Sequence, residues 1–75
     1  MAQHYLDADT TPPIRGRYVR GNVQAAKRVA FTHLERVSEG QIGIYDNALG
    51  GTFHGYAIKN AGEAPYFEEP TGEAA

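Results

Sequence analysis

Apolar residues recur at helical spacing along one long stretch, Asn22 to Gly40 (NVQAAKRVAFTHLERVSEG). At 100° per residue, its apolar side chains gather on one broad face, opposite a polar face. The residues of the apolar face are Val23, Ala26, Val29, Ala30, Leu34 and Val37. Asn22 suits the N-cap, because its side-chain oxygen can accept a hydrogen bond from a backbone N–H of the first turn, and Gly40 suits the left-handed residue that ends a helix. The pattern therefore predicts an amphipathic helix that covers one face of a sheet.

The stretch from Ile14 to Arg20 (IRGRYVR) alternates in the manner of a strand. Its register is ambiguous, because each face carries a large apolar residue. In the register that we prefer, Ile14 and Tyr18 face the helix, while Arg15 and Arg17 stand on the open face. The choice of register thus decides the charge of the open face.

Two further stretches, Gln41 to Asp46 (QIGIYD) and Thr52 to Lys59 (TFHGYAIK), also alternate. In the first of them Ile42 and Ile44 share one face, as expected of a half-buried strand. The residues between the two stretches, Asn47 to Gly51, include types that tolerate a positive φ angle. The two stretches are therefore predicted to form a hairpin.

The two ends of the chain lack such patterns. Residues 1–13 show no sustained period, and the pair Pro12-Pro13 forces extended backbone on what precedes it, so we expect a flexible N-terminal arm. Residues 61–75 are interrupted by proline and glycine, which predicts an acidic, partly disordered tail. The domain proper is then residues 14–60, a two-layer α+β fold in which one amphipathic helix packs on a three-stranded sheet in the order βαββ. A right-handed crossover would make the first and second strands parallel, and the other sheet face would be left open.

The composition limits how this domain can be stabilised and where its charge lies. The 75-residue chain contains no cysteine, so neither disulfides nor thiolate zinc sites support its small core. The net charge is −2, yet six of the seven basic residues lie between Ile14 and Val37, where Glu35 is the only acid. Beyond Asn60 there are four acidic residues and no basic one. We therefore expect a basic patch in the middle of the chain, screened by an acidic tail.

The same sequence carries no sign of a membrane or of secretion. Its N-terminus lacks the basic start and apolar run of a signal peptide, and no apolar segment is long enough to span a bilayer. We expect a soluble, cytoplasmic protein that makes no membrane contact.

Residues that could carry catalysis are scarce. Covalent catalysis needs an activated nucleophile, but the single serine, Ser38, has no histidine and acid in phase with it. Gly50-Gly51 precedes neither a helix nor a lysine, which indicates a turn rather than a phosphate-binding loop. His4, Asp7 and Asp9 have side chains that can ligate a divalent metal, but on a flexible arm we expect a solvated segment instead. We predict no enzyme, no cofactor and no metal site.

Two surfaces are candidates for binding a partner. In the preferred register the open sheet face carries Arg15, Arg17, Tyr45, His54 and Tyr56. Aromatic rings that stack on bases, interleaved with arginines that meet phosphates, suit single-stranded nucleic acid, although tyrosine and arginine are equally common in protein interfaces. A slip of one residue would instead place Val19 and Phe53 on this face, as in a dimer interface. The second surface, near the start of the helix, comprises Arg20, Lys27 and Arg28, which could bind phosphates or carboxylates or form a solvated helix face.

The build of residues 14–60 resembles that of small phage-encoded inhibitors, anti-CRISPR proteins among them. The likeness rests on a short strand, a glycine turn, a helix carrying AAKRVA, and a hairpin written GQIGIYD and GTFHGYAIK. It is one of architecture without a diagnostic motif, so no functional residue is transferred. The resemblance implies a stoichiometric inhibitor in the host cytoplasm that docks on a larger host complex.

Three functions remain open on the sequence. The leading hypothesis is a small non-enzymatic binding protein, monomeric or homodimeric, that inhibits or modulates a larger protein or nucleoprotein complex by docking on it. The alternative is a small domain that binds RNA or single-stranded nucleic acid through the basic patch. The second alternative is a virion or assembly subunit that oligomerises through its open sheet face.

Overall fold

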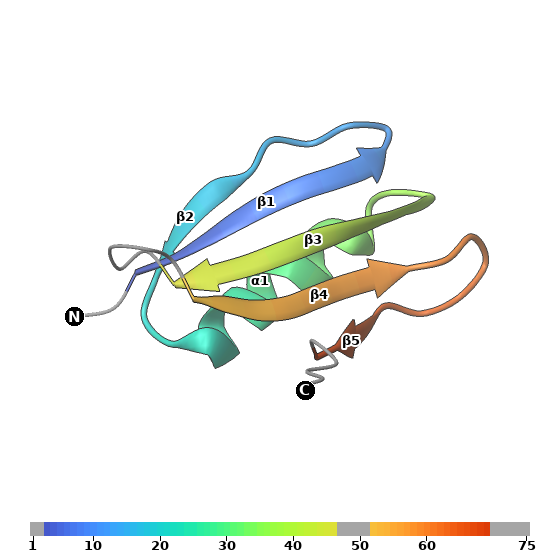
Figure 1. Cartoon of the computed structure of the whole chain (residues 1–75). Helices are drawn as coiled ribbons and strands as arrows, with labels where there is room; N and C mark the ends of the chain where they lie inside the picture. The colour runs from blue at the N-terminus through green and yellow to red at the C-terminus, as the bar shows by residue number, and fades with distance from the viewer. Residues whose placement is uncertain (1–2, 47–51, 70–75) are drawn as a thin grey trace.

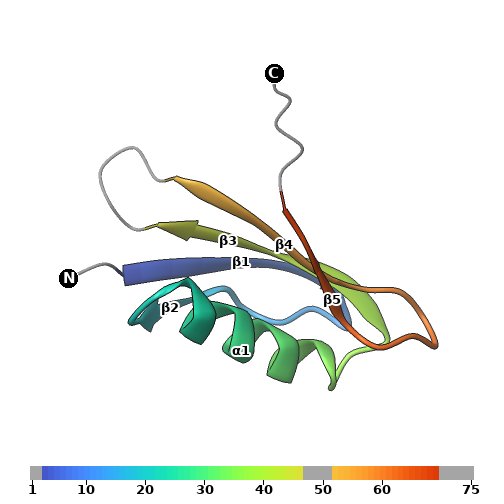
Figure 2. The same ribbon diagram turned by 90° about the horizontal axis from the view of Figure 1, so that it is seen from below.

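The computed structural model describes residues 3–46 and 52–69. These residues form a five-stranded sheet with the strand order β2-β1-β3-β4-β5, in which every neighbouring pair is antiparallel (Figure 1). The elements are β1 (Gln3–Thr11), β2 (Arg17–Arg20), α1 (Val23–Leu34), β3 (Glu39–Asp46), β4 (Phe53–Lys59) and β5 (Tyr66–Glu68). Helix α1 lies along one face of the sheet and leaves the other face uncovered (Figure 2). The fold is therefore a two-layer α+β sandwich with more strands than the three we predicted.

The N-terminal segment is a strand, so the prediction of a flexible arm over residues 1–13 is wrong for the residues described. Strand β1 lies between β2 and β3 and pairs with β3 from His4, opposite Asp46, to Thr11, opposite Glu39. Its Leu6 side chain is 1% exposed. The period of two was hidden because Leu6 is the one large aliphatic residue on the buried side of the strand. The prolines at positions 12 and 13 end β1 rather than loosen it.

The position of β1 also changes the expected topology. Because β1 is antiparallel to both β2 and β3, those two strands run parallel to each other, as predicted, but they are not neighbours. The predicted three-stranded βαββ sheet is therefore wrong. The connection from β2 to β3 runs through α1 and takes the chain from one side of β1 to the other. Strand β1 therefore lies between β2 and β3 in the sheet (Figure 1).

Part of the predicted tail is also structured. Strand β5 pairs with β4, with Phe67 opposite Ala57, and extends the sheet by a fifth strand. The Phe67 ring packs against the core, and the Lys27 ammonium group of α1 lies 4.0 Å from its centroid. This cation–π contact fastens the short edge strand to the helix. Residues 70–75, and the predicted hairpin turn from Asn47 to Gly51, lie outside the described residues.

Helix α1 begins as predicted but ends earlier. The Asn22 side chain accepts a hydrogen bond from the backbone N–H of Ala25 at 3.0 Å, which confirms the N-cap. The helix ends at Leu34 instead of continuing to Gly40. Gly40 lies in β3, where a Cβ atom would stand only 2.6 Å from the backbone carbonyl oxygen of Asp9. The glycine is therefore needed for the close approach of β1 and β3, not for a helix end.

The core lies between α1 and the inner face of the sheet. Its fully buried large side chains are Leu6 of β1, Leu34 of α1, and Ile42 and Ile44 of β3. The helix contributes alanines at positions 26 and 30, both fully buried, which allow its backbone to approach the strands. The helix face predicted from periodicity is thus the face that packs.

A β-bulge changes the hairpin from the predicted pattern. Ile44 pairs with Gly55 and Tyr45 pairs with Phe53, so His54 is an extra residue on β4. The extra residue reverses the alternation at the start of β4. Phe53 consequently lies on the open face against Tyr45, whereas the His54 ring lies 5.5 Å from His4, which is buried. The expectation that His54 stands on the open face is therefore wrong.

Candidate binding surfaces

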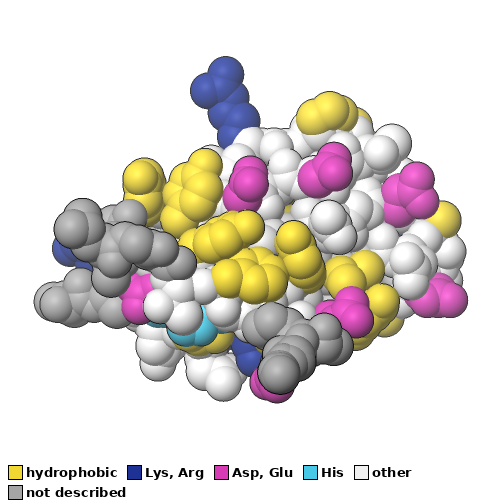
Figure 3. Space-filling model, in the orientation of Figure 1, with side chains coloured by type: hydrophobic (Ala, Val, Ile, Leu, Met, Phe, Trp, Pro, Cys, Tyr) yellow, Lys and Arg dark blue, Asp and Glu magenta, His cyan; other side chains and the backbone are white. Residues whose placement is uncertain are grey.

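Aromatic side chains are grouped on the uncovered face of the sheet. Ring centroids lie 5.1 Å apart between Tyr5 and Tyr18, 5.0 Å between Tyr45 and Phe53, and 4.9 Å between Phe53 and Tyr56. Tyr18, the most exposed of them, has 62% of its surface accessible. These five residues come from β1, β2, β3 and β4 and form what we call the aromatic face (Figure 3). No part of α1 covers it.

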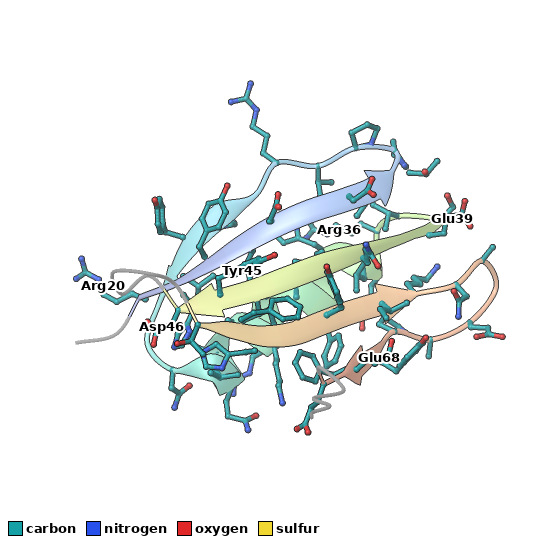
Figure 4. The ribbon with its side chains drawn as sticks, in the orientation of Figure 1. Arg20, Arg36, Glu39, Tyr45, Asp46 and Glu68 are labelled. Atoms are coloured by element: carbon teal, nitrogen blue, oxygen red, sulfur yellow. The ribbon has the colours of Figure 1, made fainter. Side chains whose placement is uncertain are left out.

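The charged side chains on the part of the open face between β1 and β5 are carboxylates. Asp7 and Asp9 project from β1 on the same side as Tyr5, and Glu68 of β5 stands opposite Tyr56. Figure 3 shows acidic side chains beside and between the apolar ones over the right half of this face. Arg20 lies at the far corner, where its side chain points away from the sheet (Figure 4). The open face is therefore aromatic and acidic, not aromatic and basic as predicted.

A small pocket opens on this face beside the aromatic rings. It has a volume of about 190 Å³ and is lined by Asp7, Ala8, Asp9, Gln41, Gly43, Tyr45 and Tyr56. Gly43 lies at its base: a Cβ atom there would stand 3.0 Å from the Tyr45 ring and 3.4 Å from the Tyr56 ring. The glycine therefore lets the two rings, which flank the pocket, pack closely against the backbone of β3. We call this pocket the Asp7 pocket.

The pKa of Tyr45 reflects the environment of the Asp7 pocket. Burial raises the pKa of the Tyr45 phenol above its ordinary value, and the neighbouring Tyr56 and the Asp7 carboxylate raise this pKa further. A carboxylate has this effect because it disfavours a second negative charge nearby. With Asp7 and Asp9 in its lining and no basic side chain among the described residues that line it, the pocket disfavours anions and favours cations.

The arginines predicted for the open face lie on the other side of the sheet. Arg17 stands opposite Leu6 in the β1–β2 pair, so its side chain is on the helix side. A hollow of about 550 Å³ there is lined by Ile14, Arg15, Gly16, Arg17, His33 and Arg36. Partial burial lowers the pKa of His33, and the guanidinium groups of Arg17 and Arg36 lower this pKa further. We call this second surface the basic hollow.

The residues predicted to bind a partner are thus divided among several places. Tyr45 and Tyr56 meet on the open face, whereas Arg15 and Arg17 meet in the basic hollow. The second predicted surface is also divided. Arg20 is on β2 at one edge of the sheet, and Lys27 contacts Phe67 on β5 at the opposite edge.

Arg28, the last residue of the predicted set, is exposed on α1. The expectation of a single surface made by Arg20, Lys27 and Arg28 therefore does not hold. An acidic tail that screens the basic patch is also unsupported by the described residues, because Glu68 lies on β5, at the sheet edge opposite β2.

Sequence reasoning missed the residues that give the open face its character. Tyr5, Asp7 and Asp9 were assigned to an arm, and Tyr18 and Phe53 were assigned to the helix side. A signal for the first three was present, because YLDAD alternates apolar and acidic side chains in the strand period. Phe53 had no such signal, because the bulge that reorients it leaves no local pattern.

Two histidines, the buried His4 and the half-buried His54, contact each other on the helix side of the sheet. His4 is 3% exposed, and within the described residues its Nδ1 and the Nε2 of His54 have no hydrogen-bond partner. A metal would require at least one further ligand here. The described part of the chain contains no group of three His, Cys, Asp or Glu side chains placed to hold a metal ion. Likewise, residues 3–46 and 52–69 include no helix with the length and apolar character needed to cross a membrane.

Comparison of the chain with protein-family models, with curated proteins and with solved structures found no match. The functional argument accordingly depends on the surfaces described above.

Proposed function

We propose that this protein is a non-enzymatic binding protein that docks on a protein partner through the aromatic face, and that the partner presents a basic surface. The observation that carries this proposal is a contacting pair and a contacting trio of aromatic rings on an uncovered sheet face, beside a pocket lined by two carboxylates. Exposed aromatic side chains dominate the energy of protein interfaces, and complementary charge sets orientation and specificity. By occupying the partner's surface, such a protein would act as a stoichiometric inhibitor or modulator.

The sheet face is better suited to docking than the sheet edges. Edge strands can recruit a partner strand through their free backbone groups, but here β2 has four residues and β5 has three. Such short edges present few backbone groups. The aromatic face extends over four strands and is the larger apolar surface.

Charge favours a protein partner over the two alternatives on this face. Phosphates of RNA or single-stranded DNA would meet Asp7 and Asp9, and Glu68 at the side, so the tyrosines would stack on bases only at an electrostatic cost. A second copy of the chain, docked face to face, would bring the same carboxylates together. A basic segment of a different protein meets neither obstacle.

The proposal is tested by selecting peptides from a random displayed library on the immobilised full chain. We expect selected peptides to be enriched in lysine and arginine. Their affinity should fall at least tenfold for Tyr18→Ser and be unchanged for Arg28→Ser, which alters an exposed side chain of α1. Peptides without basic enrichment, or an affinity that Tyr18→Ser leaves unchanged, would refute docking through this face.

Two further measurements address the alternatives directly. Labelled mixed-sequence RNA, titrated by fluorescence anisotropy at low and then physiological salt, should not bind. Binding that falls with salt and is lost in Arg17→Ala would instead assign the protein to nucleic acid through the basic hollow. Light scattering should give a monomer, and an oligomer that Tyr18→Ser dissociates would favour the assembly subunit.

A further inference from the structure

The Asp7 pocket has the composition of a site for an organic cation. Its lining combines the carboxylates of Asp7 and Asp9, the rings of Tyr45 and Tyr56, and the amide of Gln41. Aromatic faces attract cations through their quadrupole, and carboxylates pair with guanidinium and ammonium groups. From this lining we infer that the pocket binds a cationic side chain of the partner, with arginine preferred over lysine, an inference that rests on the proposed function.

The strand register explains how these groups come together. Asp7, Gly43 and Tyr56 are aligned across β1, β3 and β4, because Gly43 pairs with both of the other residues. Tyr45 is two residues from Gly43 on the same strand and therefore lies on the same face. Gly43 alone in this group lacks a side chain, so the pocket is bounded by a carboxylate on one side and by rings on the others.

The size of the pocket limits the ligand. About 190 Å³ is less than the roughly 300 Å³ at which pockets for drug-sized molecules begin, but it can accept the end of a single side chain. A guanidinium group is planar, stacks on aromatic rings and donates several hydrogen bonds in one plane. Asp7 and Asp9, two residues apart on the same side of β1, would accept them. An ammonium group would satisfy the charge but not the planar stacking.

The chain's own lysines are engaged elsewhere. Lys27 lies over the Phe67 ring on the helix side of β5, and Lys59 donates hydrogen bonds to the carbonyl oxygens of Val37 and Ser38 at 3.0 and 3.1 Å. Arg28 is exposed on α1, and Arg20 points away from the sheet at a far corner (Figure 4). The other three arginines, Arg15, Arg17 and Arg36, line the basic hollow on the opposite side of the sheet. A cation that enters the Asp7 pocket would therefore come from the partner.

The test uses small probes and the ¹⁵N-labelled full chain. Nα-acetyl-arginine methylamide is titrated while backbone amide shifts are recorded by NMR, in parallel with the lysine and citrulline analogues. We expect saturable shifts centred on Gly43 and Tyr45 for arginine, weaker binding for lysine and none for citrulline, which keeps the shape but lacks the charge. The double variant Asp7→Asn and Asp9→Asn should weaken arginine binding at least fivefold, and both positions are exposed enough to tolerate the change.

The control separates this inference from the proposed function. Tyr18→Ser removes an aromatic side chain that does not line the pocket, so arginine binding should be unchanged while affinity for selected peptides falls. Equal binding of arginine and citrulline, or arginine binding that survives the double variant, would overturn the cation site. If peptides bound through the aromatic face but arginine did not bind at all, the pocket would be refuted and docking would stand. Tighter binding of lysine than of arginine would refute the stated preference.

Discussion

Replacing Leu6 with alanine tests whether residues 3–11 are a central strand or a dispensable arm. Leu6 is 1% exposed and is among the four largest fully buried side chains. Truncation of a buried leucine to alanine costs about 2–5 kcal/mol, through lost burial and the cavity left behind. A 75-residue domain has a free energy of unfolding of about 4–11 kcal/mol. The variant should therefore lose a large part of its stability, and a loss of about 5 kcal/mol would unfold a domain whose stability is about 4 kcal/mol.

Urea unfolding followed by far-ultraviolet circular dichroism measures this loss. Thr11→Ala is the matched control, because Thr11 is an exposed residue of the same strand. The backbone carbonyl of Thr11, which accepts hydrogen bonds from the backbone N–H and hydroxyl of Ser38, is kept in this variant. We expect the control to remain within about 0.5 kcal/mol of the original chain. A Leu6→Ala variant as stable as the control would contradict the central position of β1.

Two further predictions concern a close backbone contact and a titration. Gly40→Ala should lower the free energy of unfolding by more than about 2 kcal/mol, because the new Cβ would stand 2.6 Å from atoms of β1. Gly62→Ala, at φ +79° and with no atom within 4 Å of the new Cβ, should lower it by about 1 kcal/mol through backbone strain alone. Equal urea midpoints for the two variants would be inconsistent with the close contact at Gly40. Arg17→Gln should raise the pKa of His33, measured by NMR, because a guanidinium that disfavours the imidazolium is removed, but burial and Arg36 should still hold this pKa below its ordinary value. Because the pKa of His33 is lowered in the folded state, the neutral imidazole contributes to stability fully above about pH 6.5, and this contribution is lost as the pH falls toward the folded-state pKa. Arg17→Gln should therefore reduce the loss of stability between these two pH values. An unchanged His33 titration in that variant would argue against the proximity of the two groups.

The elements with strong local signals could be predicted from the sequence. Helix α1 was recognised because its apolar residues repeat over several turns, and its first residue was identified because Asn22 has the side chain that an N-cap needs. The pairing of β3 with β4 followed from two alternating stretches that are separated in the sequence by a short segment containing glycine. In each case the evidence lies within a few residues of the element itself.

The strands with weak local signals were missed. In β1 the buried side is His4, Leu6, Ala8 and Thr10, which together resemble a polar segment because the single leucine is flanked by small or polar side chains. Such a strand is stable only because β2 and β3 pair with both of its edges. Strand β5 has three residues and depends on Phe67 and its contact with Lys27. Tertiary contacts, rather than local preference, determine both strands.

The character of the open face depends on two features that no local pattern reports. The first is the register of β2: because Val19 and not Tyr18 is buried, Arg17 turns toward the helix and leaves the open face without its predicted cations. The second is the bulge opposite Tyr45, which exchanges Phe53 for His54 on that face. Since strand side chains alternate with a period of two, a shift of one residue reverses every side chain beyond it. The two shifts together replace a basic surface, which would suit a phosphate or carboxylate partner, with an aromatic and acidic one, so the charge expected of a protein partner changes from negative to positive.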